Sequence, residues 1–307
     1  ASPTPSIDNA SIFRFTGPSA LAGAARPAAT ITGNATFLAS PVIALDKSAD
    51  RLFALVSMGR SAAAILVFDH VSLKAGNTPP SRVIAGRATS LHNIGAFAVD
   101  GTRNRIYAGA TRDADGQVDI LVFNYAAVVS GNMPPSAVLN FGSVGIRPTD
   151  MVLDEVSDRL FIADTANEVQ VFDHASTLTS GSMVPNRTFS GPNTGISRAM
   201  YHIALDSAGR LLVSAGGVSV DIYANGATAI GNITPVARIM GSNLGSPEAL
   251  TVYTGPGASA GGDLYVSVES GKVLVFTDID KANGNVAPAR TFSINTANEL
   301  GLIVNAR

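Results

Sequence analysis

An internal repeat of about fifty residues runs through the chain and limits the folds open to it. The repeat shows first in a series of prolines, spaced by 53, 55, 50, 50 and 53 residues: Pro27, Pro80, Pro135, Pro185, Pro235 and Pro288. Two further series follow it. One is an aromatic residue in an apolar run: Phe13, Phe68, Phe123, Phe172, Tyr223 and Phe276. The other is an aspartate after an apolar run: Asp46, Asp100, Asp154 and Asp206. Six units of about 51 residues use all 307 residues, so we expect a single domain over 1–307, with residues 1–10 as an extended linker.

Each unit contains four short apolar runs of strand length, separated by turn residues, and none has the period of a helix over ten residues. Units of this length with four strands predict an all-β, six-bladed β-propeller. Five complete four-stranded blades are expected at residues 41–87, 94–142, 148–191, 200–241 and 247–294. The N-terminal segment holds only the last two strands of a unit, at 11–15 and 29–32, and residues 300–305 match a first strand. The last blade is therefore expected to be closed by N- and C-terminal strands.

The repeat resembles a known type of propeller repeat. The pattern of an apolar run ending in Asp, then Arg-Leu-Phe-Ile-Ala, stands at Met151–Asp154 and Arg159–Ala163, and similar runs follow Asp100 and Asp206. This pattern resembles the NHL-type repeat. The Gly-Asn-x-x-Pro link, as in 76–80 and 131–135, resembles one found in bacterial exported propellers. The resemblance implies a six-bladed ring and no particular activity, because propellers serve many functions.

Composition excludes several classes of protein. Charged residues make up 14% of the chain and the net charge is −2, which argues against a nucleic-acid partner. There is no cysteine, so disulfides, thiolate metal sites and a cysteine nucleophile are excluded. No apolar run is long enough for a transmembrane segment. A first residue other than Met, only four lysines and the lack of thiols favour an exported chain, secreted or periplasmic.

Charged and polar side chains gather in the loops that lead into the expected innermost strands, around the mouth of the central channel. We predict a binding site there, formed by Arg147, Asp150, Arg198, Tyr201, His202, Glu248 and Glu299. The competing interpretation is that these arginines and carboxylates only link neighbouring blades. No catalytic residue is assigned, because neither a Gly-x-Ser-x-Gly elbow nor a recognisable triad is present.

Residues that recur at the same position of several units are expected to be structural. The Asp46 series should cap turns, the arginines of the Pro-x-Arg sites (Arg82, Arg187 and Arg290) should bond at blade edges, and His70 and His174 should end strands. No cofactor is predicted, and four scattered histidines are too few for a zinc site. Calcium is kept as an option at residues 113–119, where aspartates alternate around a glycine, although a hairpin turn explains the same pattern.

These observations predict an exported, non-enzymatic binding or structural propeller that contacts a protein, a glycan or a larger extracellular assembly. The alternative is a calcium-assisted lactonase, esterase or lyase, with Asp150, Glu248 and Glu299 clustered at the channel mouth. The alternative requires three carboxylates that converge on one point.

Overall fold

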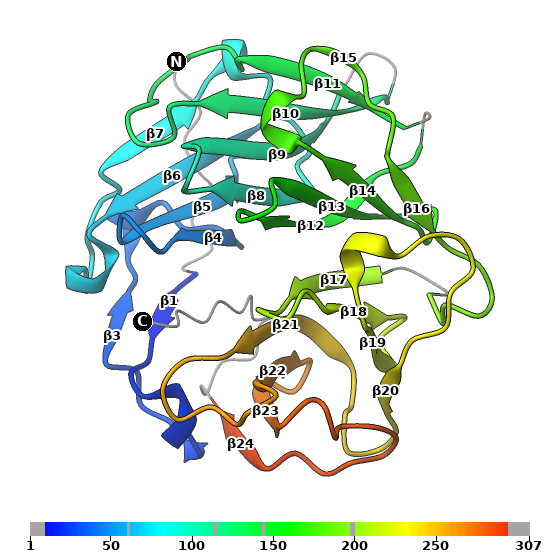
Figure 1. Cartoon of the computed structure of the whole chain (residues 1–307). Helices are drawn as coiled ribbons and strands as arrows, with labels where there is room; N and C mark the ends of the chain where they lie inside the picture. Colours follow the sequence, from blue (N-terminus) through cyan, green and yellow to red (C-terminus); the bar gives the residue numbers. More distant parts are fainter. Residues whose placement is uncertain (1–9, 60–61, 113–115, 143–144, 197–199, 294–307) are drawn as a thin grey trace.

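The computed structural model describes residues 10–59, 62–112, 116–142, 145–196 and 200–293. In these residues the chain forms five sheets, each with four antiparallel strands, arranged around a central axis (Figure 1). We call them blades 1 to 5 in chain order. They occur where the sequence predicted the five complete blades. Short parallel strands, β15 (Gly181–Ser182) and β2 (Gly23–Ala24), extend two of these sheets. None of the described helices is long and apolar enough to cross a membrane.

The strands of each blade run outward from the axis in chain order. Blade 1 holds β4 (Val42–Asp46), β5 (Arg51–Ser57), β6 (Ala63–Asp69) and β7 (Arg82–Ala85). Blade 2 holds β8 (Phe97–Asp100), β9 (Arg105–Thr111), β10 (Val118–Asn124) and β11 (Ala137–Phe141). Blade 3 holds β12 (Pro148–Asp154), β13 (Arg159–Asp164), β14 (Val169–Asp173) and β16 (Arg187–Phe189). Blade 4 holds β17 (Met200–Leu205), β18 (Leu211–Ala215), β19 (Ser219–Tyr223) and β20 (Ala237–Met240). Blade 5 holds β21 (Pro247–Tyr253), β22 (Asp263–Val268), β23 (Lys272–Thr277) and β24 (Arg290–Ser293).

The hydrophobic core lies between the blades rather than at one centre. The second and third strands of each blade are mostly apolar and buried on both faces; in β6, for example, residues 64–68 are all at most 1% exposed. One cluster joins Phe53 and Ile65 of blade 1 to Phe97 and Phe123 of blade 2, and similar clusters fill the other interfaces. Because every blade buries two faces, few positions are left for charged residues, which accounts for the low charge of the chain.

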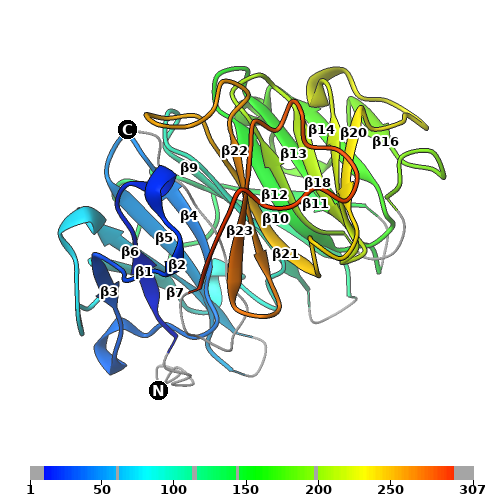
Figure 2. The same ribbon diagram turned by 90° about the horizontal axis from the view of Figure 1, so that it is seen from below.

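The sixth position in the ring holds less than the sequence predicted. A two-stranded sheet of β1 (Ile12–Arg14) and β3 (Ala29–Ile31) lies between blade 5 and blade 1 (Figures 1 and 2). The sequence predicted six four-stranded blades, but the described residues form five such blades and one two-stranded sheet. The first strand expected for the sixth blade, at residues 300–305, lies outside the described residues.

Both neighbours hold the N-terminal segment in place. Ile12 packs against the cluster of blade 1 that contains Leu52 and Phe68. On the other side, the ring of Phe15 lies 5.8 Å from that of Phe292, and the short strand β2 (Gly23–Ala24) pairs in parallel with β24. The segment therefore spans the gap between the last and the first complete blade.

The strand register shows one contact that recurs in all six units, and it changes the assignment of one residue in the aromatic series. One residue of every outermost strand pairs in parallel with a glycine of the next unit: Ile31 with Gly76, Ile84 with Gly131, Leu139 with Gly181, Phe189 with Gly231, Ile239 with Gly284 and Phe292 with Gly23. These six residues have the same spacings as the prolines. In β1, Ile12 pairs with Ile31 as Ile65 pairs with Ile84, which makes Phe15 the equivalent of Phe68. The prediction of Phe13 was wrong by two residues, because both aromatics point to the same face of the strand.

The Gly-Asn link fastens each outer strand to the next unit. Asn132 Oδ1 accepts a hydrogen bond of 2.7 Å from the backbone nitrogen of Ala88, directly after the outer strand of blade 1. Asn77, Asn232 and Asn285 make the same contact in their units. Gly86 has a φ of +120°, and a Cβ there would lie 2.5 Å from Asn132 Oδ1. The turn therefore needs glycine opposite the asparagine.

Replacing Asn132 with alanine is expected to lower the free energy of unfolding by about 1 kcal/mol, because the Ala88 N–H loses its acceptor in a partly exposed turn. Urea-induced unfolding followed by circular dichroism measures this. Met133→Ala, at the next residue, whose side chain is 52% exposed, serves as the control outside the asparagine contact. Equal costs for both variants would contradict the role given to the asparagine.

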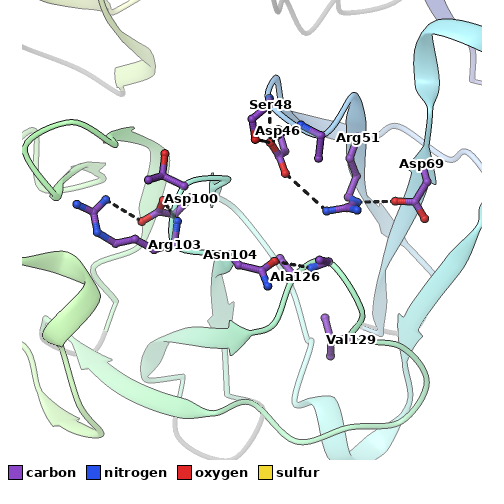
Figure 3. A network of polar contacts seen from close by, with 12 residues as sticks. Asp46, Ser48, Arg51, Asp69, Asp100, Arg103, Asn104, Ala126 and Val129 are labelled. Atoms are coloured by element: carbon purple, nitrogen blue, oxygen red, sulfur yellow. Dashed lines mark hydrogen bonds and ion pairs between the residues drawn. The ribbon is translucent and has the colours of Figure 1, made fainter.

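The recurring aspartates and arginines have structural partners, as predicted. Asp46 Oδ1 accepts hydrogen bonds from the backbone nitrogens of Ser48 and Ala49, and Asp100, Asp154 and Asp206 cap their turns in the same way. Asp69 pairs with Arg51 at 2.5 Å (Figure 3). The same carboxylate pairs with Arg82 at 3.2 Å. Arg82 also donates to the carbonyl oxygens of Ala126 and Val129 in blade 2. The arginines thus bond both within a blade and across to the next.

Candidate site at the channel mouth

The predicted site residues lie where the innermost strands begin. The innermost strands of successive blades are neighbours around the channel, in the order β4, β8, β12, β17 and β21. In β12, β17 and β21 the pairing with the second strand is irregular at this end, between Pro148 and Asp150, Met200 and Ile203, and Pro247 and Ala249. Such bulges redirect side chains away from the regular alternation of a strand. By register Asp150 and His202 stand at equivalent points of blades 3 and 4, whereas in blade 5 that point is held by Ala249 and Glu248 lies one residue before it.

The structure brings Asp150 and His202 together across the interface of blades 3 and 4. Asp150 Oδ2 lies 3.2 Å from His202 Nδ1 and accepts a hydrogen bond of 2.9 Å from the backbone nitrogen of Ile203. Its other carboxylate oxygen accepts from Met151 N at 2.8 Å. The backbone nitrogen of His202 donates to Ser214 Oγ, which is fully buried. Asp150 therefore connects two blades through a backbone N–H group as well as through the imidazole.

Replacing Asp150 with alanine is expected to destabilise the fold by about 1–3 kcal/mol, because the N–H group of buried Ile203 loses its acceptor. Asp150→Asn keeps a side-chain oxygen for that donor and is expected to cost less than half as much. Urea-induced unfolding of both variants measures the difference. If the two substitutions cost the same, the bond to Ile203 does not contribute to the link between the blades.

The other predicted site residues are placed as follows. Arg147 is exposed, and its backbone is fixed by a pair of hydrogen bonds with Thr165. Glu248 is half-buried in β21. Arg198 and Glu299 lie outside the described residues, as does the side chain of Tyr201. Among the residues that the structure describes, no three histidine, aspartate or glutamate side chains are grouped to hold a metal ion. The convergence that the calcium-dependent alternative requires is thus not observed in this part of the chain.

The remaining candidates from the sequence have local roles. His70 and His174 follow β6 and β14 with left-handed φ values of 53° and 55°, and each begins a short 3-10 turn, at Val71–Leu73 and Ala175–Thr177. In the segment considered for calcium, Asp113 and Asp115 lie outside the described residues, and buried Asp119 pairs with Arg112 Nε at 3.0 Å. The two histidines therefore end strands, as predicted.

A second candidate site, not predicted from the sequence, is a depression of about 430 Å³ between blades 4 and 5. Its walls carry hydroxyl groups, small residues and one charged pair: Ser207, Ala208, Arg210, Ala224, Thr254, Ser259, Ala260, Gly261 and Asp280. Arg210 forms an ion pair with Asp280 and donates to the carbonyl oxygen of Gly261 at 2.7 Å. The volume is in the range of small-molecule sites, about 300–1,000 Å³.

This depression exists because blades 4 and 5 depart from the repeat at one place. By strand register, Ala224 stands where blades 1 and 3 have Asp69 and Asp173. Arg210 keeps its Nε on Asp206 of its own blade and, with no aspartate at the position of Ala224, directs its terminal nitrogens to Asp280 and Gly261 of blade 5. In addition, blade 5 has nine residues, 254–262, between its first two strands, where blades 1 to 3 have four. Both departures are visible in the sequence, but only the fold shows that they meet.

Comparison with known proteins supports the fold. No protein-family model matches the chain, and no curated protein matches its sequence. Among solved structures, the chain is similar to the WD40 β-propeller domain of Doa1, with a TM-score of 0.52 and 9% sequence identity. The match covers 83% of this chain and 69% of that one. The chain is therefore a repeat protein with a β-propeller fold, which is commonly used for protein–protein interaction. The NHL-type resemblance stays a prediction, since so low an identity supports the fold alone.

Proposed function

We propose that the protein is an exported, non-enzymatic binding propeller of six blades that contacts a protein partner through the connections between its third and fourth strands. Large apolar side chains are exposed on these connections in four blades: Leu73, Tyr125, Val128, Met133, Val184, Ile230 and Val236. Single exposed apolar residues are common on any protein. Their concentration on one kind of connection favours a contact surface.

Tyr125 is the observation that carries this proposal. It directly follows β10, has a φ of +63° and is 69% exposed. Equivalent positions with the same backbone conformation are held by His70, His174 and Asp278, residue types that tolerate it better than tyrosine does. Val128, in the same turn, is also 69% exposed. Exposed tyrosines are frequent anchors in protein interfaces, and strained backbone is often found at functional sites.

Photo-crosslinking in the native source tests this surface. A photoreactive amino acid at position 125 is expected to capture one reproducible partner. The matched control is position 218, because Val218 is 63% exposed but precedes the third strand of its blade, at the opposite end from Tyr125. The double substitution Tyr125→Ser and Val128→Ser is expected to weaken binding of that partner at least tenfold, with stability changed by less than about 0.5 kcal/mol. Capture at position 218 alone would place the contact on the other face.

Recognition of a glycan is a second candidate function, favoured by the depression between blades 4 and 5. Ser207 and Thr254 supply hydroxyl groups, and Arg210 and Asp280 supply a donor and an acceptor beside them. Such groups suit a neutral, polyhydroxylated ligand about the size of a disaccharide.

NMR titration with a panel of neutral disaccharides tests this candidate. Ala224→Asp restores the side chain found in blades 1 and 3. The new carboxylate is expected to bind the terminal nitrogens of Arg210, to remove them from Asp280 and to abolish binding. Asn124→Asp makes the same change in blade 2 and is expected to leave binding intact. Absence of saturable shifts around residues 254–261 in the unmodified protein would remove the glycan from consideration.

Export is part of the proposal and rests on composition: only four lysines and no cysteine. Fractionation of the source cells with an antibody is expected to find the protein in the periplasm or the medium. Recovery with cytoplasmic markers would contradict this part. No observation in the described residues favours the calcium-assisted enzyme.

A further inference from the structure

The loop that joins the first two strands of blade 5, residues 254–262, is longer than its counterparts, which have four residues in blades 1 to 3 and five in blade 4. Its two halves are fixed in different ways. The second half is bound to blades 4 and 5: Ser259 Oγ accepts a hydrogen bond from the backbone nitrogen of Asp278, and the carbonyl oxygen of Gly261 accepts one from Arg210. The position of the first half, residues 254–258, depends on other contacts.

The first half is held at one carbonyl group. The carbonyl oxygen of Pro256 accepts a hydrogen bond of 3.0 Å from Tyr253 Oη and one of 3.1 Å from Ser19 Oγ. A carbonyl oxygen has two lone pairs, so both bonds form together. Tyr253 belongs to blade 5, whereas Ser19 belongs to the N-terminal segment, 237 residues before Pro256. Ser19 is itself fixed, because Arg290 of β24 donates to its carbonyl oxygen.

Two glycines let the backbone of the first half lie directly against these hydroxyl-bearing side chains. A Cβ at Gly255 would lie 2.7 Å from the ring of Tyr253, and a Cβ at Gly257 would lie 2.7 Å from Ser19 Oγ. Such distances are too short for a Cβ, so a larger residue at either position would displace the loop. The loop and the N-terminal segment therefore fit closely at this point.

The first half of the loop also carries Thr254, which lines the depression between blades 4 and 5. Thr254 lies two residues before Pro256, so the two hydrogen bonds at Pro256 fix the path of the chain as it leaves β21. Ser19 does not line the depression itself. It supports the residue that does, from a part of the chain on the other side of blade 5.

We propose that Ser19 is a positioning residue for the depression: through Pro256 it sets the place of the Thr254 hydroxyl group that a ligand meets. Groups that bind a ligand need such support from the residues behind them. As regards the ligand, this inference rests on the glycan site proposed above. Its consequence is that the depression takes its binding shape only while the N-terminal segment is docked beside blade 5.

Amide NMR spectra of the ligand-free protein test the positioning. Ser19→Ala is expected to shift the signal of Thr254, because the loop loses one of two donors at its central carbonyl group. Ser19→Thr keeps the hydroxyl group and is expected to leave that signal in place. Ser11→Ala is the control, because it removes a hydrogen bond of 2.8 Å to Thr32 within the same N-terminal segment. Shifts confined to the N-terminal segment, or equal shifts in Ser19→Ala and Ser19→Thr, would overturn the proposal.

A second variant disturbs the same contact from the loop. Gly257→Ala is expected to shift the Thr254 signal as well, since the added Cβ meets Ser19 Oγ. Gly131→Ala is the matched control: its φ of +74° is close to the +83° of Gly257, but a Cβ there has nothing within 4 Å. A Thr254 signal that Gly257→Ala leaves unchanged shows that the fit with Ser19 does not set the place of Thr254.

Titration with the panel of neutral disaccharides tests the effect on binding. Ser19→Ala is expected to weaken binding about fivefold, the effect of one hydrogen bond. Ser19→Thr and Ser11→Ala are expected to change it less than twofold. Equal affinities of Ser19→Ala and the unmodified protein would contradict a positioning role. If no disaccharide binds the unmodified protein, the glycan candidate fails, whereas the ligand-free spectra still decide whether Ser19 positions Thr254.

Discussion

Replacing Arg238 with methionine is expected to lower the free energy of unfolding by about 3–5 kcal/mol at pH 7. The reason is that Arg238 Nε donates to the carboxylate of Asp221, whose side chain is completely buried. Without the guanidinium, this carboxylate keeps only a weak contact of 3.5 Å with Ser219 Oγ. Methionine preserves most of the side-chain volume, so the loss reports the missing charge. Urea-induced unfolding at pH 7 measures it.

The pH dependence of that loss checks its cause. Burial raises the pKa of Asp221 above its ordinary value, and Arg238 acts in the opposite direction. Removing Arg238 raises the pKa further, so the folded variant takes up a proton at a pH where the unfolded chain does not. The difference in free energy of unfolding between the Arg238→Met variant and the original protein is therefore expected to be smaller at pH 5 than at pH 7. Asp221→Asn combined with Arg238→Met is expected to recover much of the stability at pH 7. A deficit that is the same at both pH values would refute this account.

Replacing Asp173 with asparagine is expected to cost about 2 kcal/mol at pH 7 and to make stability less sensitive to acid. Arg187 holds the carboxylate through two bonds of 2.8 Å, and Arg159 Nε donates to it at 2.5 Å. The hydrogen bond with Arg187 is the main cause that keeps the pKa of Asp173 well below its ordinary range, and Arg159 adds to it. A lowered pKa in the folded state means that the stabilisation is present above the unfolded value of about 3.9 and is lost as pH falls below it. Unfolding measured from pH 7 to pH 2.5 should show this loss in the original protein.

A matched pair of variants separates this effect from a general effect of acid. Asp69→Asn is expected to reduce stability and its sensitivity to acid in the same way as Asp173→Asn. The reason is that Arg51 and Arg82 flank Asp69 and lower its pKa, although burial acts in the opposite direction. Asp278→Asn is expected to change stability by less than about 0.5 kcal/mol, because its partner Lys281 is 83% exposed. If Asp278→Asn flattens the pH profile as much as Asp173→Asn, the two arginines are not the source of the acid sensitivity.

The sequence predicted best those features that depend on neighbours along the chain. The aspartates that cap turns recur in four units and find their partners within the same turn, and the arginines at Pro-x-Arg sites recur in three and each bond an aspartate of their own blade. The positions of the five complete blades followed from the same periodicity. The register of the first aromatic failed, because Phe13 and Phe15 both lie in an apolar run and only the pairing of Ile12 with Ile31 distinguishes them.

Features that depend on packing between units were harder to predict. The contact of Asp150 with His202 joins residues 52 positions apart, and its bond to Ile203 requires the irregular start of β17. The depression between blades 4 and 5 arises where Ala224 of one unit faces the long 254–262 segment of the next. A comparison of the repeats, position by position, would have marked both departures, because a residue that differs from its equivalents is informative in a repeat protein.

The parallel pairing of each outer strand with a glycine of the following unit has a consequence for the order of assembly during synthesis. As the chain emerges from the ribosome, the edge of each blade stays uncovered until the next fifty or so residues have been made. The outer strands of blades 1 to 4 can therefore be paired one after another, each when the glycine of the following blade has been made. The edge of β24 is different, because Gly23, which covers it, lies 269 residues before its partner Phe292. The segment 10–32 can pair with Gly76 as soon as blade 1 has been made, but its contact with β24 has to wait until the fifth blade is complete.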